Sequence, residues 1–272
     1  MTEAEVLPPE APQEHRSQER RSPMPLAKPV VTYVLLGIIT VVFVAEVALG
    51  GLTSTRILVP MGAQINLLVW QGEYWRLFAA MFLHIGVTHY LFNAWALYSL
   101  GRDIESFYGS LRFVVIYVLS GLFGGLAYYL LGAPQTAVVI SAGASGAIFG
   151  IVGAELAFWL RNRLLFGDFG KQRLMNLGIL VGINVVFGAS TPGINNLAHM
   201  GGLVSGFALA WVLTPRYEVT WSWNELGQTP RLVDRNPVWA QVAIVIFAVA
   251  LLIAGLSLGD QRWAAIEPLL RR

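Results

Sequence analysis

The chain has 272 residues, of which 56% are hydrophobic and only 12% are charged, and its formal net charge at pH 7 is +2. A mean hydropathy of +0.60 excludes an ordinary soluble domain, so we expect a protein of the lipid bilayer and no nucleic-acid partner. The sequence contains no cysteine, which excludes disulfides, thiol catalysis and thiolate metal sites.

The first 28 residues are rich in Pro, Glu, Gln, Arg and Ser, a composition that predicts a disordered cytoplasmic N-terminal tail. After this tail, apolar runs recur at about the 20 residues that a helix needs to cross a bilayer core about 30 Å thick. The predicted fold is therefore an all-α polytopic membrane helical bundle. Its seven predicted spans are 30–49, 88–100, 111–131, 142–160, 174–189, 197–213 and 238–258. Residues 215–237 are expected to form a cytoplasmic connection, and residues 259–272 a short extracytoplasmic tail.

The distribution of basic residues predicts the orientation of these spans. Most of the 18 Lys and Arg residues fall in segments that are cytoplasmic when the N-terminus is cytoplasmic, as the positive-inside rule requires. The second, fourth and sixth spans then all run from the outer to the inner face. Their outer ends carry His89 and Asn93, Ser145, and His199, respectively. These four polar side chains are therefore predicted to lie at one depth in the membrane.

Small residues on the fourth and sixth spans predict that these two helices pack closely. Gly146 and Gly150 form one GxxxG motif and Gly202 and Gly206 another, and such stripes let helix backbones approach each other in lipid. The approach would bring Ser145, which adjoins Gly146, within hydrogen-bond reach of the sixth span. The alternative interpretation is that both motifs serve helix association alone.

A serine next to a histidine suggests nucleophilic catalysis. Histidine titrates near neutrality and can take the proton that makes a serine hydroxyl a nucleophile. Neither Glu155 nor Glu218 lies close enough in the predicted arrangement to orient His199, so we expect a Ser145–His199 dyad without a carboxylate. Phe149, one turn after the serine, can hold the imidazole ring by stacking.

The second span offers donors for the oxyanion that acyl transfer creates. His89 and Asn93 are four residues apart and share a helix face, so together with the Ser145 N–H they can form an oxyanion hole. Alternatively, Asn93 makes an interhelical hydrogen bond and His84 anchors a loop. Three histidines also raise the question of a metal site, but HExxH is absent and no acidic residue is near them in the sequence. We expect no metal and no cofactor.

Together these motifs resemble those of rhomboid intramembrane serine proteases. The resemblance rests on "GASG" around Ser145, "AHMGGLVSG" around His199 and "HIGVTHYLFN" from His84 to Asn93. It rests also on "YWR", which ends at Arg76, and on "GRDIESFYG". All of these motifs occur in the family's order and spacing over about residues 30–214.

The resemblance implies a rhomboid-like six-helix core at 29–214 with a cavity that opens to the outer face, followed by one extra C-terminal helix at 238–258. It implies a serine endopeptidase of the bacterial plasma membrane that cleaves peptide bonds in or near transmembrane segments of other proteins. The family's aromatic residue after the serine is often tyrosine, whereas this chain has phenylalanine. The implied catalytic residues are Ser145 and His199, the oxyanion residues are His89 and Asn93, and the supporting residues are Phe149, Gly143, Gly146, Gly202, His84 and Arg76.

Two other functions remain open at this stage. One is a catalytically silent rhomboid-like protein that binds membrane clients, although such relatives usually lack the serine or the histidine. The other is a transporter, which would show internal repeats and charged residues along a central path. The sequence leaves the substrate and the oligomeric state undetermined.

Overall fold

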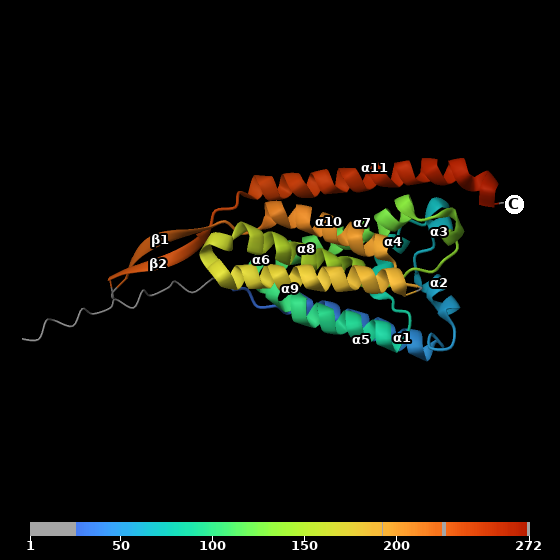
Figure 1. Cartoon of the computed structure of the whole chain (residues 1–272), viewed down its shortest axis with the longest axis horizontal. Coiled ribbons are helices and arrows are strands. Elements are labelled where there is room, and N and C mark those ends of the chain that lie inside the picture. Colours follow the sequence, from blue (N-terminus) through green and yellow to red (C-terminus); the bar gives the residue numbers. More distant parts are fainter. Residues whose placement is uncertain (1–25, 192, 225–226, 271–272) are drawn as a thin grey trace, which may run out of the picture.

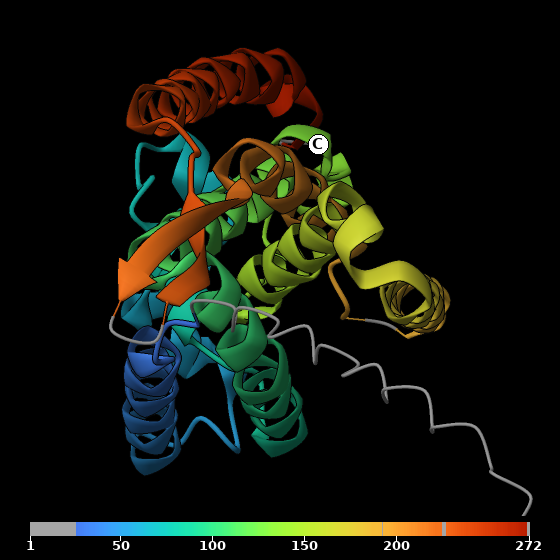
Figure 2. The same ribbon diagram turned by 90° about the vertical axis from the view of Figure 1, so that its left-hand side faces the viewer.

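The computed structural model describes residues 26–191, 193–224 and 227–270, so most of the predicted N-terminal tail lies outside the described residues. The long helices run side by side along one axis (Figure 1), which is the predicted all-α bundle. Viewed along that axis, α11 lies on the opposite side of the bundle from α1 and α5 (Figure 2). The long helices and their immediate continuations are α1 Val30–Ala48, α5 Val87–Ala96, a π-helical turn Leu97–Gly101, α6 Arg102–Tyr108, α7 Ser110–Leu131, α8 Ser145–Arg161, α9 Arg163–Ser190, α10 Asn196–Leu213 and α11 Val238–Leu270.

Five helices of the described chain are long and apolar enough to cross a membrane: α1, α7, α9 from Phe166, α10, and α11 as far as Pro268. A sixth span is possible where Arg76–Phe82 and Val87–Tyr108 join at a bend of 90°. The remaining predicted span is α8, which has 17 residues and a length of about 25 Å. Most of its residues are buried in the bundle, so its neighbours rather than lipid surround it.

The loop between α1 and α5 is built from short helical segments. They gather, with the turn that precedes α8, at one end of the bundle, the right-hand end in Figure 1. The segments of the loop are η1 Thr55–Ile57, α2 Leu58–Met61, α3 Asn66–Trp70, α4 Arg76–Ala79 and η2 Ala80–Phe82, whereas η4 Pro134–Thr136 belongs to the connection between α7 and α8.

Helix α8 begins three residues later than the hydropathy predicts. Gly143 adopts φ +137°, a conformation that side chains other than glycine rarely take, and its N–H donates to the Ala80 carbonyl at 2.9 Å. Ser141 pairs with Gln64 through two backbone hydrogen bonds of 2.9 Å. Residues 141–144, at the start of the apolar run, therefore form a non-helical strap that is bound to the α1–α5 loop. Ser145 becomes the first residue of the helix.

Glycines bring α7, α8 and α10 into backbone contact. A Cβ atom at Gly202 would lie 2.8 Å from the Gly146 carbonyl carbon, and one at Gly206 would lie 2.7 Å from the Gly150 carbonyl carbon. A Cβ atom at Gly124 of α7 would lie 2.7 Å from the Ala198 carbonyl oxygen. Because even one methyl group would not fit, these three helices pack at the closest distance that backbones allow.

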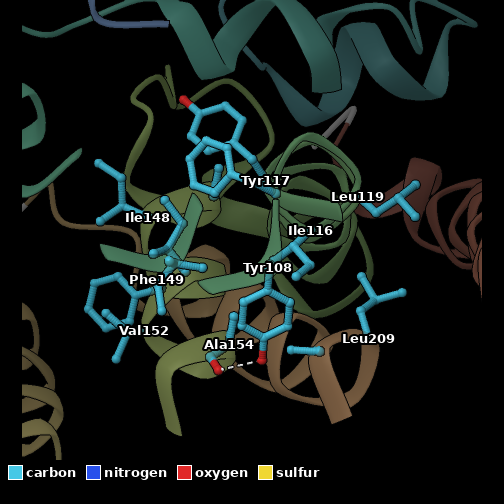
Figure 3. Packing of buried hydrophobic residues seen from close by; sticks show 14 of the residues in the cluster. Tyr108, Ile116, Tyr117, Leu119, Ile148, Phe149, Val152, Ala154 and Leu209 are labelled. Atoms are coloured by element: carbon cyan, nitrogen blue, oxygen red, sulfur yellow. Dashed lines mark hydrogen bonds between the residues drawn. The ribbon is translucent and has the colours of Figure 1, made fainter. Parts of the chain in front are cut away.

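Apolar side chains fill the rest of the core around α8. Ile116 and Tyr117 of α7 pack with Ile148 and Val152 of α8 and with Leu209 of α10 (Figure 3). Dispersion contacts of this kind supply the packing energy for helix association where lipid offers no hydrophobic drive.

Glu105, in the motif "GRDIESFYG", fixes the start of α1. Its carboxylate accepts the N–H groups of Val31 (2.9 Å) and Thr32 (2.7 Å) and the hydroxyls of Thr32 (2.7 Å) and Ser110 (2.6 Å). Glu105 is fully buried, and these bonds satisfy N–H groups that have no partner inside α1. The carboxylate therefore joins the first helix to the α6–α7 corner.

The connection before α11 contains a β-hairpin that the sequence analysis did not predict. Strand β1, Tyr217–Asn224, pairs antiparallel with β2, Gly227–Asp234, and the hairpin projects from the end of the bundle opposite the α1–α5 loop (Figure 1). The sequence analysis predicted a connection at 215–237 from its polar composition, but it missed the alternating pattern that forms β1 and β2.

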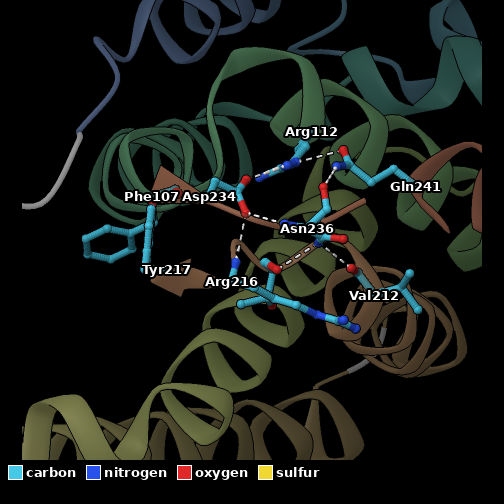
Figure 4. A network of polar contacts seen from close by, with 9 residues as sticks. Phe107, Arg112, Val212, Arg216, Tyr217, Asp234, Asn236 and Gln241 are labelled. Atoms are coloured by element: carbon cyan, nitrogen blue, oxygen red, sulfur yellow. Dashed lines mark hydrogen bonds and ion pairs between the residues drawn. The ribbon is translucent and has the colours of Figure 1, made fainter. Parts of the chain in front are cut away.

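A polar network anchors this hairpin to the bundle (Figure 4). Asp234 forms a 2.7 Å ion pair with Arg112 of α7 and accepts the backbone N–H groups of Arg216 (2.9 Å) and Asn236 (2.8 Å). Burial raises the pKa of Asp234, but these hydrogen bonds and the Arg112 charge outweigh it and hold the pKa below its ordinary value of 3.8.

The last helix is longer than predicted, because α11 continues through the residues expected to form a C-terminal tail. Trp263 is fully buried, stacks on Tyr129 at a centroid distance of 6.2 Å and donates its indole N–H to the Tyr129 carbonyl at 2.9 Å. Asp260 accepts the hydroxyls of Tyr129 (2.6 Å) and of Tyr74 in the α1–α5 loop (2.7 Å). Contacts with α7 thus extend the helix beyond its apolar segment.

Candidate active site

Ser145 and His199 meet where α8 and α10 begin. The Ser145 Oγ and the His199 Nε2 atoms are 2.8 Å apart. Both side chains are partly exposed, at the same end of the bundle as the α1–α5 loop. The close approach of the helices at Gly146 and Gly202 makes this contact possible across 54 residues of sequence.

The His199 ring is held by an aromatic ring rather than by a carboxylate. Phe149 stacks on it with a centroid distance of 4.4 Å and an interplanar angle of 8°. The His199 Nδ1 atom is buried and has no hydrogen-bond partner within the described residues. For Nε2 to accept the serine proton, the neutral ring must carry its own proton on Nδ1, and we assign that tautomer to the reactive form.

His89 lies beside Gly143, just before Ser145. A Cβ atom at Gly143 would be 2.8 Å from the His89 Nε2 atom, so only glycine leaves room for the ring. The His89 Nδ1 atom accepts the backbone N–H of Ile85 at 3.2 Å, and we therefore assign the ring proton to Nε2. The Nε2–H donor consequently lies on the side of the ring that faces Gly143.

Asn93 is buried one turn further along α5. Its side-chain amide donates to the His89 carbonyl at 2.8 Å, which uses one of the two hydrogens on Nδ2. No hydrogen bond joins Asn93 to Ser145 or His199 among the residues that the structure describes. The amide is thus near His89, and its second hydrogen is available to another acceptor.

The start of α8 supplies further donors. The first hydrogen bond inside this helix runs from the Ile148 N–H to the Ala144 carbonyl at 3.0 Å. The N–H groups of residues 145–147 precede it and have no partner within the helix. Together with the helix dipole, they favour negative charge at the position of the serine hydroxyl.

His84 and Arg76 lie further from the serine. His84 is buried, and its ring contacts the edge of the His89 ring at a centroid distance of 5.5 Å. Arg76 donates to the carbonyls of Val59 (2.7 Å) and Ala63 (3.0 Å) and pairs with Glu73 at 2.7 Å. Among the residues that the structure describes, neither side chain forms a hydrogen bond, ion pair or ring contact with Ser145 or His199. Arg76 instead holds the α1–α5 loop together.

The sequence analysis missed two features that position the starts of α8 and α10. The first is a pair of small residues on α7: Gly121 packs closely against α8, and Gly124 against α10. The motif "SGLFGG", which contains both, has the same pattern of small residues as the GxxxG pairs. Asn195 accepts the Ala198 N–H at 3.0 Å as the N-cap of α10 and donates to the Ser141 hydroxyl at 2.9 Å. This asparagine thus ties the start of α10 to the strap before α8.

Within the described part of the chain, no group of three or more His, Cys, Asp or Glu side chains could hold a metal ion. His84 and His89 lie close together, but His199 interacts with Ser145 instead of completing a ligand set with them.

The bundle of long apolar helices defines an integral, multi-pass membrane protein, in which a serine and a histidine are in hydrogen-bond contact where α8 and α10 begin. The sequence profile of the Rhomboid domain matches residues 71–216, slightly more than half of the chain. The protein belongs to the rhomboid family. The matched segment contains both helix α8 and helix α10, whereas the hairpin and α11 lie outside it.

Named relatives agree with this assignment. The chain is 41% identical over 187 residues to "Rhomboid protease GluP" of Bacillus subtilis (strain 168), covering 68% of this chain and 35% of GluP. It is 35% identical over 210 residues to "RHOMBOID-like protein 1" of Arabidopsis thaliana, covering 76% of this chain and 52% of the relative. "Putative rhomboid protease YdcA" of Bacillus subtilis is 34% identical over 154 residues, 56% of this chain and 74% of YdcA. The chain therefore spans about a third of GluP and about half of the plant relative.

Proposed function

We propose that this protein is an intramembrane serine endopeptidase that cleaves peptide bonds in or near transmembrane segments of other membrane proteins. The observation that carries the proposal is the 2.8 Å contact between Ser145 Oγ and His199 Nε2 at the start of two glycine-packed helices. The relatives named as rhomboid proteases support the same reaction class.

In the proposed reaction, Ser145 Oγ attacks the carbonyl carbon of the scissile bond while His199 Nε2 takes the hydroxyl proton. The tetrahedral intermediate collapses, and His199 returns the proton to the leaving amine, which leaves an acyl group on the serine. A water molecule then attacks this ester with His199 as its base, and release of the carboxylic acid restores the serine hydroxyl.

The oxyanion of both tetrahedral intermediates needs donors that are already in position. The Ser145 N–H, the His89 Nε2–H and the second hydrogen of the Asn93 amide are the proposed donors. Removal of one such donor typically costs about 100- to 1000-fold in rate. The Ser145 N–H sits at the positive end of the α8 dipole, and the His89 ring lies close to it beside Gly143; the dipole adds to the stabilisation of the negative charge.

Phe149 takes over the orienting role that an acid has in a triad. Its stacked ring restricts rotation of the imidazole but does not stabilise an imidazolium as a carboxylate would. The proposed dyad therefore relies on geometry rather than on a buried negative charge, which fits a site surrounded by apolar helices where a charge would be costly.

We further propose that the N-terminus is cytoplasmic, as in a bacterial plasma membrane, and that the site opens to the outer face. The Ser145 end of the bundle carries the α1–α5 loop, while Arg112, Arg161 and Arg216 lie near the opposite end, in agreement with the positive-inside rule. Water for hydrolysis would then enter from outside, since irregular backbone at membrane depth is tolerated where it lines a wet cavity.

The test uses purified protein in lipid vesicles with a model transmembrane substrate. Ser145→Ala and His199→Ala variants are expected to lose cleavage while keeping the thermal stability of the parent protein. Normal cleavage by either variant would overturn the assignment.

A further inference from the structure

The tautomer of His89 depends on a backbone N–H in the preceding turn. The Ile85 N–H donates to His89 Nδ1 at 3.2 Å, and an imidazole nitrogen that accepts a hydrogen bond cannot carry the proton of the neutral ring. If this N–H pointed elsewhere, the proton could move to Nδ1. The ring would then present an acceptor instead of a donor toward Gly143, where an oxyanion needs a donor.

The turn that carries this N–H comprises residues 84–86, directly before α5. Gly86 adopts φ +82°, and its N–H donates to the His84 carbonyl at 3.2 Å. The His84 N–H donates to the Glu46 Oε1 atom at 3.0 Å, across 38 residues of sequence. A carboxyl group on α1 therefore fixes the residue that immediately precedes Ile85.

Glu46 is poorly explained by packing alone. It is 1% exposed, and its Oε2 atom has no hydrogen-bond partner within the described residues. A leucine would fill similar space without the cost of burying a half-satisfied carboxyl group. Across the described part of the chain, the one hydrogen bond of this carboxyl group is the one that it accepts from the His84 N–H.

We propose that Glu46 is a positioning residue for His89. Its carboxyl oxygen holds the turn at residues 84–86, so that the Ile85 N–H keeps His89 in the tautomer with Nε2–H directed toward Gly143. The inference rests on the proposed oxyanion role of His89, but it makes a claim about the turn and the tautomer that holds without catalysis.

Two substitutions separate the acceptor from the rest of the side chain. Glu46→Gln keeps an acceptor oxygen in the same place, and kcat is expected to stay within about 3-fold of the parent value. Glu46→Leu removes the acceptor, and kcat is expected to fall about 10-fold or more with little change in KM, because one oxyanion donor is worth about 100- to 1000-fold. Glu155→Leu is the matched control. Glu155 is also a buried acid with an unpartnered Oε2 atom, but it lies nearer the end of α8 that is remote from Ser145.

The second readout is the tautomer itself. The chain has only 4 histidines, so ¹⁵N-histidine labelling and NMR in detergent micelles can follow His89, with His89→Asn protein used to assign its signals. The parent protein, Glu46→Gln and Glu155→Leu are expected to show the Nε2–H form, and Glu46→Leu a mixture of both tautomers.

The outcomes are distinct from those of the proposed function. An unchanged His89 tautomer in folded Glu46→Leu protein would overturn the inference, whatever the activity, and so would equal losses of kcat in the Gln and Leu variants. If Ser145→Ala protein cleaved normally, the proposed function would fail, while the NMR result would still decide whether Glu46 sets the tautomer.

Discussion

The contact between α8 and α10 makes a quantitative prediction for Gly202→Ala. The added Cβ atom would lie 2.8 Å from the Gly146 carbonyl carbon and closer still to its oxygen, whereas ordinary contacts begin at 3.4 Å. Neither atom belongs to a flexible side chain, so α10 must move from α8 by at least about 0.6 Å, the kind of backbone shift that overpacking forces.

This shift acts directly on the dyad, because His199 is one turn from Gly202 on the same helix. A separation of 2.8 Å between Ser145 Oγ and His199 Nε2 would grow to about 3.4 Å or more, beyond the usual range of hydrogen bonds from or to a hydroxyl. We expect Gly202→Ala to lose about 100-fold in kcat, as misplacements near 1 Å do, and to lose about 1–3 kcal/mol of stability from overpacking.

The assay measures initial cleavage rates of a model transmembrane substrate in vesicles and thermal unfolding in detergent. Gly37→Ala on α1 is the matched control, since a Cβ atom there has nothing within 4 Å, and it should keep parental activity. Parental kcat and stability in Gly202→Ala would refute the argument that backbone contact between α8 and α10 sets the dyad distance.

Three further predictions follow from single contacts. Phe149→Leu should lower kcat about 10-fold by freeing the His199 ring, an effect consistent with stacking energies of about 1 kcal/mol. Phe149→Tyr keeps a stacking ring and should retain activity. Equal rates in the parent protein and both variants would contradict the orienting role of Phe149. Trp263→Ala should lower the free energy of unfolding, measured by denaturation in micelles, by about 3–5 kcal/mol. The reason is that the indole is fully buried and donates a hydrogen bond to the Tyr129 carbonyl. A loss below about 1 kcal/mol would show that α11 is not anchored there. The pKa of Asp234 is lower in the folded than in the unfolded state. The stabilisation that the Asp234 carboxylate provides should therefore be present above about pH 4 and disappear as pH falls through the folded-state pKa. Asp234→Asn should reduce the slope of Tm against pH in that acidic range, and an unchanged slope would contradict the network in Figure 4.

The features that the sequence predicted are those encoded by composition and by small-residue spacing. The apolar runs predicted the bundle, and the GxxxG motifs predicted the close packing of α8 and α10. Phe149 was recognisable because a stacking ring one helical turn from the serine is a local relation. In each case the information lies within one or two helices.

The features that were missed depend on backbone conformation or on contacts between distant loops. Hydropathy contains no information on the positive φ of Gly143, so the sequence analysis predicted the start of α8 three residues too early. The contact of Glu46 with the His84 N–H requires the geometry of the turn at Gly86, which no pattern reveals. The alternation of Tyr217, Val219, Trp221 and Trp223 with polar residues is a period-2 pattern that predicts strands. Mean hydropathy, which identifies membrane spans, does not distinguish this pattern from an irregular polar loop.

The proposed chemistry depends on Ser145 being a nucleophile that His199 activates. Covalent labelling with a serine-directed fluorophosphonate, followed by mass spectrometry of the labelled peptide, tests this claim most directly. We predict an adduct on Ser145 Oγ in the parent protein, none in Ser145→Ala and a labelling rate reduced by about 100-fold or more in His199→Ala. Absence of labelling in folded parent protein, or parental labelling in His199→Ala, would contradict the dyad and favour a catalytically silent member of the family.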